Sequence, residues 1–154
     1  MKEALDEAIK EIKRVDHLFY VSLKYTRTVD MMKHMLERLI STYSFGVHAL
    51  LKQLKEEEKI DEIPNNEGLR IKLLLDTFPD EELRGYINLY LRLRKLVRAS
   101  YTKREEFRRH VTMTATIDNG EVVEVNIDSL KEDYEKTKSF IHFTRHIVYG
   151  EEEL

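Results

Sequence analysis

Apolar residues recur at helical spacing through most of the chain. From residue 2 to about 25, apolar positions three and four apart alternate with charged ones, which predicts a first helix. The β-branched Thr26 and Thr28 have poor helix propensity and predict a break near residue 26. From about 28 to 59 a second helix carries a long stripe whose steps alternate between three and four residues, typical of a helix packed on others. The stripe consists of Val29, Met32, Leu36, Leu39, Tyr43, Val47, Leu50 and Leu54.

The middle of the chain predicts shorter elements. Gly46 is a candidate kink in the second helix, and residues 60–68 (IDEIPNNEG) have the composition of a loop. Residues 67–77 are expected to form a short helix or a turn, and another helix is expected to start with Pro79 in its first turn and to run to about Ser100. The sequence Thr102-Lys103-Arg104-Glu105 fits a capping box and predicts a fresh helical start near residue 103.

After His110 the apolar period changes from helical to alternating. Two β-prone runs, 111–117 and 121–127, flank Asp118-Asn119-Gly120. Asn-Gly between such runs predicts a β-hairpin in which both turn residues adopt positive φ. Ser129-Leu130-Lys131-Glu132 then fits a capping box that opens a last helix, which runs to Ile147 or Val148 and stops at Gly150. The predicted fold is mainly α, an antiparallel bundle of four main helices with a β-hairpin (about 111–127) before the C-terminal helix, in one domain over 1–154.

Composition excludes several classes of protein. The chain has no cysteine, which excludes disulfides and thiolate chemistry, and it has no apolar run long enough to span a membrane. Its N-terminus lacks the apolar core of a signal peptide, so we expect a soluble cytoplasmic protein. Neither a glycine-rich phosphate loop nor a nucleophile elbow occurs, and no cofactor or metal is expected. His142 and His146, four residues apart, are the alternative as a two-histidine zinc site.

Positive charge is concentrated in one segment of an otherwise acidic chain. Residues 92–110 hold eight Lys and Arg against two Glu, a balance of +6, whereas the whole chain carries −3. Such a block predicts either a phosphate-bearing ligand or neutralisation by acidic segments, for which Glu56–Glu58 and Glu151–Glu153 are candidates. Aromatic side chains in the segment would stack on bases. The candidate nucleic-acid-binding residues are Arg92, Arg94, Lys95, Arg98, Tyr101, Lys103, Arg108 and Arg109.

A motif within this segment resembles that of the HEPN superfamily. Arg104 and His110 are separated by five residues and lie between a long helix and the closing helix, as the Arg-x4–6-His motif of that superfamily does. Arg27 and His34 also fit the spacing, but only Arg104 and His110 have that position in the bundle. The sequence departs from the family pattern at Glu105, because a neutral polar residue usually follows the motif arginine.

The resemblance implies metal-independent RNA cleavage by a homodimer. His110 would be the general base or acid, and Arg104 would hold the scissile phosphate and stabilise its developing charge. Many proteins of this group are instead inactive binding modules. The alternative function is therefore a non-catalytic module for protein interaction or polyanion binding, which would present either the stripe from Val29 to Leu54 or the 92–109 face to its partner.

Overall fold

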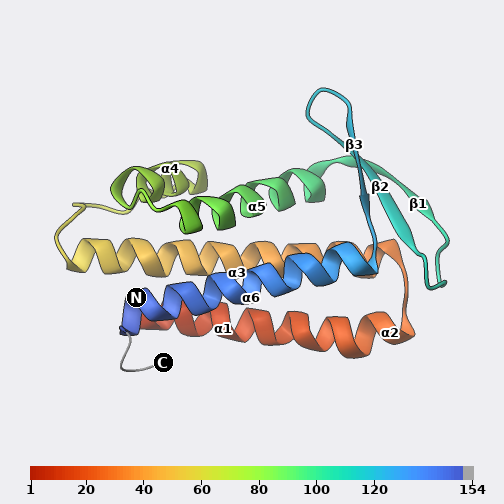
Figure 1. Cartoon of the computed structure of the whole chain (residues 1–154), viewed down its shortest axis with the longest axis horizontal. Helices are drawn as coiled ribbons and strands as arrows, with labels where there is room; N and C mark the ends of the chain where they lie inside the picture. The colour runs from red at the N-terminus through yellow and green to blue at the C-terminus, as the bar shows by residue number, and fades with distance from the viewer. Residues whose placement is uncertain (151–154) are drawn as a thin grey trace.

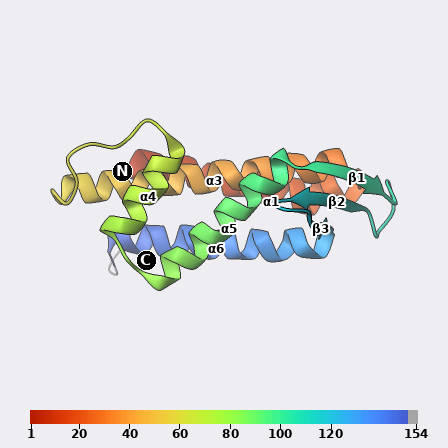
Figure 2. The ribbon, with the colours of Figure 1, turned by 90° about the horizontal axis from the view of Figure 1, so that it is seen from above.

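The computed structural model describes residues 1–150 and confirms a mainly helical fold with a small antiparallel sheet before the last helix (Figure 1). Helices α1, α3 and α6 lie side by side, and α5 crosses over α3 and α6 (Figure 2). The helices are α1 (Lys2–His17), α2 (Leu23–Tyr25), α3 (Val29–Glu56), α4 (Glu67–Thr77), α5 (Glu81–Arg98) and α6 (Ile127–Tyr149), with a π-helical turn, Leu18–Ser22, joining α1 to α2. The predicted break after residue 25 is confirmed, since α2 ends at Tyr25 and residues 26–28 lie outside the helices.

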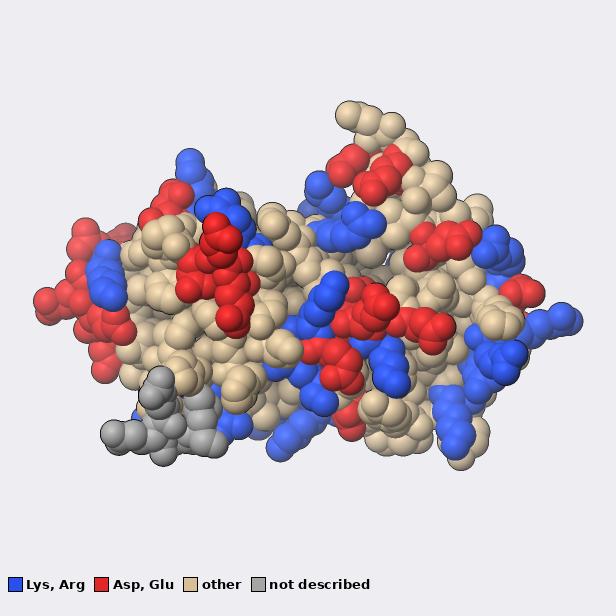
Figure 3. Space-filling view, in the orientation of Figure 1, with Lys and Arg blue, Asp and Glu red and all other residues tan. Residues whose placement is uncertain are grey.

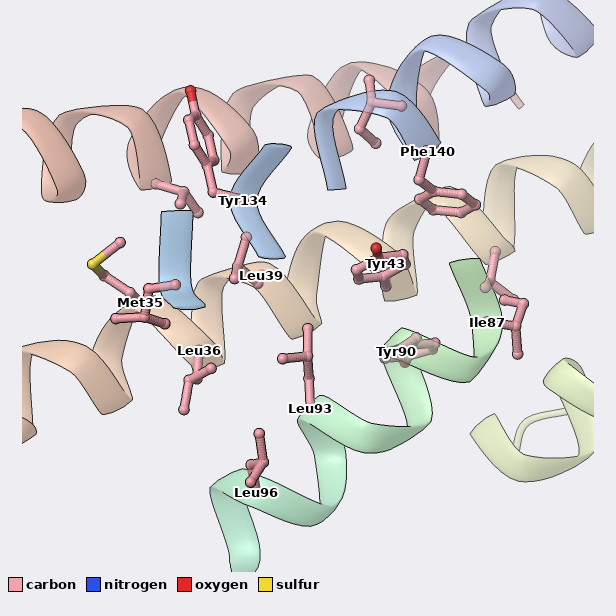
Figure 4. Packing of buried hydrophobic residues seen from close by; sticks show 14 of the residues in the cluster. Met35, Leu36, Leu39, Tyr43, Ile87, Tyr90, Leu93, Leu96, Tyr134 and Phe140 are labelled. Carbon is pink, nitrogen blue, oxygen red and sulfur yellow. The ribbon is translucent and has the colours of Figure 1, made fainter. Parts of the chain in front are cut away.

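The core forms where the apolar stripes of the helices meet. Every residue of the α3 stripe from Val29 to Leu54 is buried, so this stripe is used inside the chain and is not free to bind a partner. At its centre the Tyr43 ring stacks on Tyr90 of α5 and Phe140 of α6, with ring centroids 5.3 and 4.8 Å apart (Figure 4). These aromatic contacts tie three helices together in the middle of the bundle.

Gly46 brings α3 and α6 close together and does not interrupt α3. Helix α3 is continuous from Val29 to Glu56, with Gly46 inside it. A Cβ atom at position 46 would overlap the Phe140 ring, lying 2.9 Å from its Cζ. Glycine is therefore needed here for packing, because only a bare backbone leaves room for the ring.

Side-chain caps fix the helix starts, and two of them differ from prediction. Asp80 caps α5 through Leu83 N–H, so Pro79 precedes the cap and does not occupy the first turn. Asn126 caps α6 and forms a reciprocal capping box with Ser129, so the helix begins at Ile127 and Ser129 is its third residue. Asparagine is as good a cap as serine, which explains how the cap lies three residues earlier than predicted.

The sheet has three strands where the sequence predicted two. Strands β2 (Thr112–Ile117) and β3 (Glu121–Val125) form the predicted hairpin, and β1 (Ser100–Arg104) pairs antiparallel with β2. The helical start predicted near residue 103 is therefore wrong. Tyr101 lies opposite the buried Ala115 and Lys103 opposite the buried Met113, and this cross-strand pairing overrides the local capping pattern.

The hairpin turn also differs in detail from prediction. Positive φ falls on Asp118 (49°) and Gly120 (93°), whereas Asn119 keeps a negative φ. Ile117 pairs with Glu121, so the loop consists of the three residues 118–120 that separate the two predicted β-prone runs. Asn-Gly predicted the correct place for the turn, but the positive φ expected at Asn119 is found at Asp118.

Candidate nucleic-acid interface

The sheet neutralises part of the basic segment. Three of the predicted nucleic-acid-binding or catalytic cations bond carboxylates that lie on β3 or in the hairpin turn. The pairs are Arg92 with Glu121, Lys95 with Asp118 and Arg104 with Glu124, at N–O distances of 3.6, 3.2 and 3.2 Å. Of the acids predicted for this role, Glu57 pairs with Lys59, and Glu151–Glu153 lie outside the described residues.

Three further candidates contact α3 or their own helix. Lys103 lies 3.3 Å from Asp30 and 3.8 Å from Glu106. The half-buried Tyr101 ring receives the ammonium of Lys33, 4.5 Å from its centroid. Arg94 lies over the Tyr90 ring, 5.8 Å from its centroid. These side chains attach the sheet to α3 or cover the core, which leaves them less available to a ligand.

The loop 105–111 joins β1 to β2 and docks on the corner between α2 and α3. Phe107 N–H donates to the carbonyl of Arg27 at 2.7 Å. The carboxylate of Glu106 accepts from Val29 N–H at 3.0 Å and so caps α3 together with Thr28. Both contacts join segments more than 70 residues apart, so the loop has a defined position on the helical body.

Two residues of this loop have strained backbone. Glu105 and Phe107 adopt φ of 56° and 65°, a region that bulky residues rarely enter. Phe107 nevertheless leaves 73% of its surface exposed, so core packing does not account for its presence there. A strained position retained for an exposed aromatic ring points to a role in binding.

Two adjoining pockets form a groove beside this loop. One, of about 320 Å³, contains Arg27, Arg109 and His110 against the first turn of α6. The other, of about 280 Å³, contains Tyr20 and Lys24 beside the π-helical turn. Both are lined by Arg27 and Ile127, so they adjoin. The exposed loop residues Phe107 and Arg108 line neither pocket but neighbour Arg109 in the chain. We call the surface that combines the two pockets with these loop residues the basic–aromatic groove; its members are Tyr20, Lys24, Arg27, Phe107, Arg108, Arg109 and His110.

The cations of this groove are not neutralised. Among residues 1–150, no carboxylate lies within ion-pair distance of Lys24, Arg27, Arg108 or Arg109. Asp128 is the one acid that lines the two pockets. In the space-filling view Lys and Arg gather at the end of the molecule that bears the loop, and Asp and Glu gather at the opposite end (Figure 3). The molecule therefore presents one cationic end to an anionic partner.

Aromatic side chains missed by the sequence analysis lie at this end. Tyr20 and Tyr25 are 51% and 79% exposed, and each lies within seven residues of Arg27 along the chain. The Tyr20 ring is held at one edge by Phe19, at a centroid distance of 5.0 Å. The π-helical turn lies in the same stretch, and such turns are frequent at functional sites. The predicted helix 2–25 gave no indication that Tyr20 and Tyr25 would lie near Arg27, on which the loop 105–111 docks.

The predicted catalytic pair is brought to one end of the sheet but not into one pocket. Arg104 lies directly opposite Thr112 on β2, and Thr112 follows His110 by two residues. The Arg104 guanidinium bonds Glu124, whereas His110 lines a pocket with Arg27 and Arg109. Of the remaining predicted residues, Arg98, Arg108 and Arg109 are exposed, and the last two lie in the loop.

Residues 1–150 supply no third ligand for the alternative metal site. Within the part of the chain that the structure describes, no three side chains of His, Cys, Asp or Glu come together in a way that would hold a metal ion. His142 and His146 lie on the exposed face of α6. None of the helices in residues 1–150 combines the length and apolar character needed to cross a bilayer.

Comparison with known proteins gives no match, whether with protein-family models, curated proteins or solved structures. The side chains of the basic–aromatic groove therefore provide the basis for a functional assignment.

Proposed function

We propose that the protein binds single-stranded RNA through the basic–aromatic groove. The observation that carries this proposal is the strained and exposed Phe107 beside cations that lack carboxylate partners. Guanidinium and ammonium groups neutralise phosphates, and aromatic faces stack on bases whatever their sequence. Phe107, Tyr20 and Tyr25 would serve as stacking surfaces, with Arg27, Arg108 and Arg109 along the backbone of the strand.

Salt dependence of binding tests this proposal. Affinity for a fluorescently labelled 12-nucleotide RNA is measured by anisotropy between 50 and 200 mM salt. The double variant Arg108→Ala/Arg109→Ala is expected to bind at least tenfold more weakly at the lower salt. It should also lower the slope of log affinity against log salt by about 1.4, since each phosphate contact to a single strand contributes about 0.7.

The basic segment offers a matched control. Arg92→Ala/Lys95→Ala removes the same charge, but these two side chains already bond carboxylates of the hairpin. We expect this control to change affinity less than threefold. Equal losses in the two double variants would indicate net-charge attraction without a site. No RNA affinity at 50 mM salt would contradict the proposal and favour the protein-interaction alternative.

RNA cleavage is a second candidate function, and the position of His110 favours it. A phosphodiester in the groove would meet an imidazole beside the guanidinium groups of Arg27 and Arg109, as acid–base catalysis with charge stabilisation requires. Cleavage in EDTA that His110→Ala abolishes would support it, and loss in Arg104→Ala or Arg109→Ala would identify the phosphate-holding arginine. The resemblance to HEPN proteins adds a homodimer, which light scattering tests, and the composition adds a cytoplasmic location. Cleavage unchanged in His110→Ala would contradict this function.

A further inference from the structure

A second basic hollow lies between α1 and α3 and shares no residue with the basic–aromatic groove. Its volume is about 360 Å³, at the lower end of the range for small-molecule sites. Five of its six lining residues are basic, and no carboxylate lines it. The residues are Lys13, Arg14, His17, Leu18, His34 and Arg38.

A buried carboxylate fixes two of these side chains. Glu11 is only 3% exposed, and it bonds the guanidinium groups of both Arg14 and Arg38, the latter at 3.3 Å. A buried carboxylate needs a cation to balance its charge. One arginine is enough for this balance, so Glu11 does not account for the second arginine. Lys13, Arg14 and Arg38 contribute three positive charges, and Glu11 contributes one negative charge. The hollow therefore has a net charge of +2 before either imidazole is counted.

The two imidazoles add donors at the same place. His17 belongs to the last turn of α1, and His34 lies in the second turn of α3, so they line the hollow from opposite helices. A guanidinium group that bonds a carboxylate still has N–H groups that can donate to another acceptor. The planar arrangement of these donors matches the spacing of phosphoryl oxygens. Neither imidazole nor the Lys13 ammonium has a hydrogen bond or ion pair to another of residues 1–150.

We infer that this hollow binds a phosphoryl dianion, either inorganic phosphate or the terminal phosphate of a larger molecule. An excess of two positive charges matches the charge of a phosphate monoester. Five basic side chains from two helices line one hollow, and this arrangement suits a terminal phosphate, which offers three oxygens, better than a diester within a strand. The proposed RNA site does not enter this inference.

Histidine NMR signals test the inference directly. The protein is titrated with inorganic phosphate at fixed pH, with sodium chloride adjusted to hold ionic strength constant. The imidazole signals of His17 and His34 are expected to shift along one saturating curve, whereas that of His142, exposed on α6, stays in place. Absence of saturation by 20 mM phosphate, a concentration chosen as the limit for a site of about millimolar affinity, or equal shifts at His142 would overturn the inference.

Two exposed lysines on α1 provide a matched pair of variants. Lys13→Gln removes a charge at the hollow and should weaken phosphate binding about fivefold, from Coulomb attraction to a dianion with ordinary salt screening. Lys10→Gln removes the same charge one turn earlier, outside the hollow, and should leave binding within twofold. Equal effects of the two substitutions would contradict a local site. Both residues are exposed, so neither change should unfold the protein.

A further experiment distinguishes the two possible sources of the phosphate. A short oligonucleotide with a 5′-phosphate is compared with the same oligonucleotide ending in a hydroxyl. Shifts at His17 and His34 only with the phosphorylated form identify a polynucleotide end as the source, and shifts with inorganic phosphate alone identify the free ion. Arg108→Ala/Arg109→Ala should leave the phosphate titration unchanged, so failure of the RNA proposal is distinguishable from failure of this one.

Discussion

Replacing Phe107 by alanine and by glycine separates backbone strain from ring contacts. Both substitutions remove the same aromatic ring, which is 73% exposed, and they differ only by a Cβ atom at φ 65°. In the left-handed region a Cβ atom destabilises the folded alanine variant by about 1–2 kcal/mol. The glycine variant avoids this strain but loses about 0.5–1 kcal/mol, because its unfolded chain has greater conformational freedom. We therefore expect Phe107→Gly to be more stable than Phe107→Ala by about 0.5–1 kcal/mol, the reverse of the order at an ordinary helical position.

Urea denaturation followed by circular dichroism gives the two free energies of unfolding. For a chain of this size the expected difference corresponds to about 2–3 °C in melting temperature. RNA anisotropy on the same two variants should show equal losses of about fivefold or more, because both lack the stacking ring. An alanine variant at least as stable as the glycine variant would refute strain at Phe107. Unchanged RNA affinity in both would refute stacking by this ring.

The structure predicts the direction of the effect of three further substitutions. Gly46→Ala should destabilise the fold by about 1–3 kcal/mol in urea denaturation despite the better helix propensity of alanine, because its Cβ would overlap Phe140; a neutral result would show that the ring can move aside. Burial raises the pKa of Asp133 to about 6. Between about pH 4 and 6 the folded state keeps a proton that the unfolded state has released, so the free energy of unfolding falls as pH rises through that window. Asp133→Asn should therefore add about 1–2 kcal/mol at pH 7.5 and nothing near pH 4, and an equal gain at both pH values would contradict this origin. Asp118→Asn/Glu121→Gln should release two basic side chains of α5 and steepen the salt dependence of RNA binding, with little loss of stability since exposed ion pairs contribute little; an unchanged slope would place the RNA away from α5.

The helices were predictable because burial and period agree along them. The stripe of α3 is continuous over seven turns, so one face must be buried whatever it packs against. The helix ends were less predictable, because several residue types cap equally well and the sequence around α6 contains both Asn126 and Ser129. Strand β1 was not predictable from local pattern, since Ser100–Arg104 lacks strong β-formers apart from Tyr101 and Thr102 and depends on pairing with β2.

The candidate site was predictable in charge but not in arrangement. The basic segment located the cationic end of the molecule, and Arg108, Arg109 and His110 lie in the groove as charge and motif suggested. Arg27 and Tyr20 come from a distant part of the chain, and only the docking of Phe107 on the Arg27 carbonyl brings them there. Contacts between segments so far apart in the sequence cannot be predicted here, because the loop 105–111 that makes them has no periodic pattern of its own.

The distribution of ion pairs explains how a segment of +6 is tolerated in this fold. Its α5 half lies beside a hairpin whose acids are placed by strand register, so that Glu121 and Asp118 meet Arg92 and Lys95 without help from any ligand. In its loop half, Lys103 pairs with Glu106, but Arg108 and Arg109 have no carboxylate within ion-pair distance among the described residues. Like charges at exposed positions repel, and the cost is tolerated where a partner offsets it. Uncompensated charge at Arg108 and Arg109 coincides with strained backbone and an exposed aromatic ring, and this coincidence favours a polyanion over solvent as the occupant of the groove.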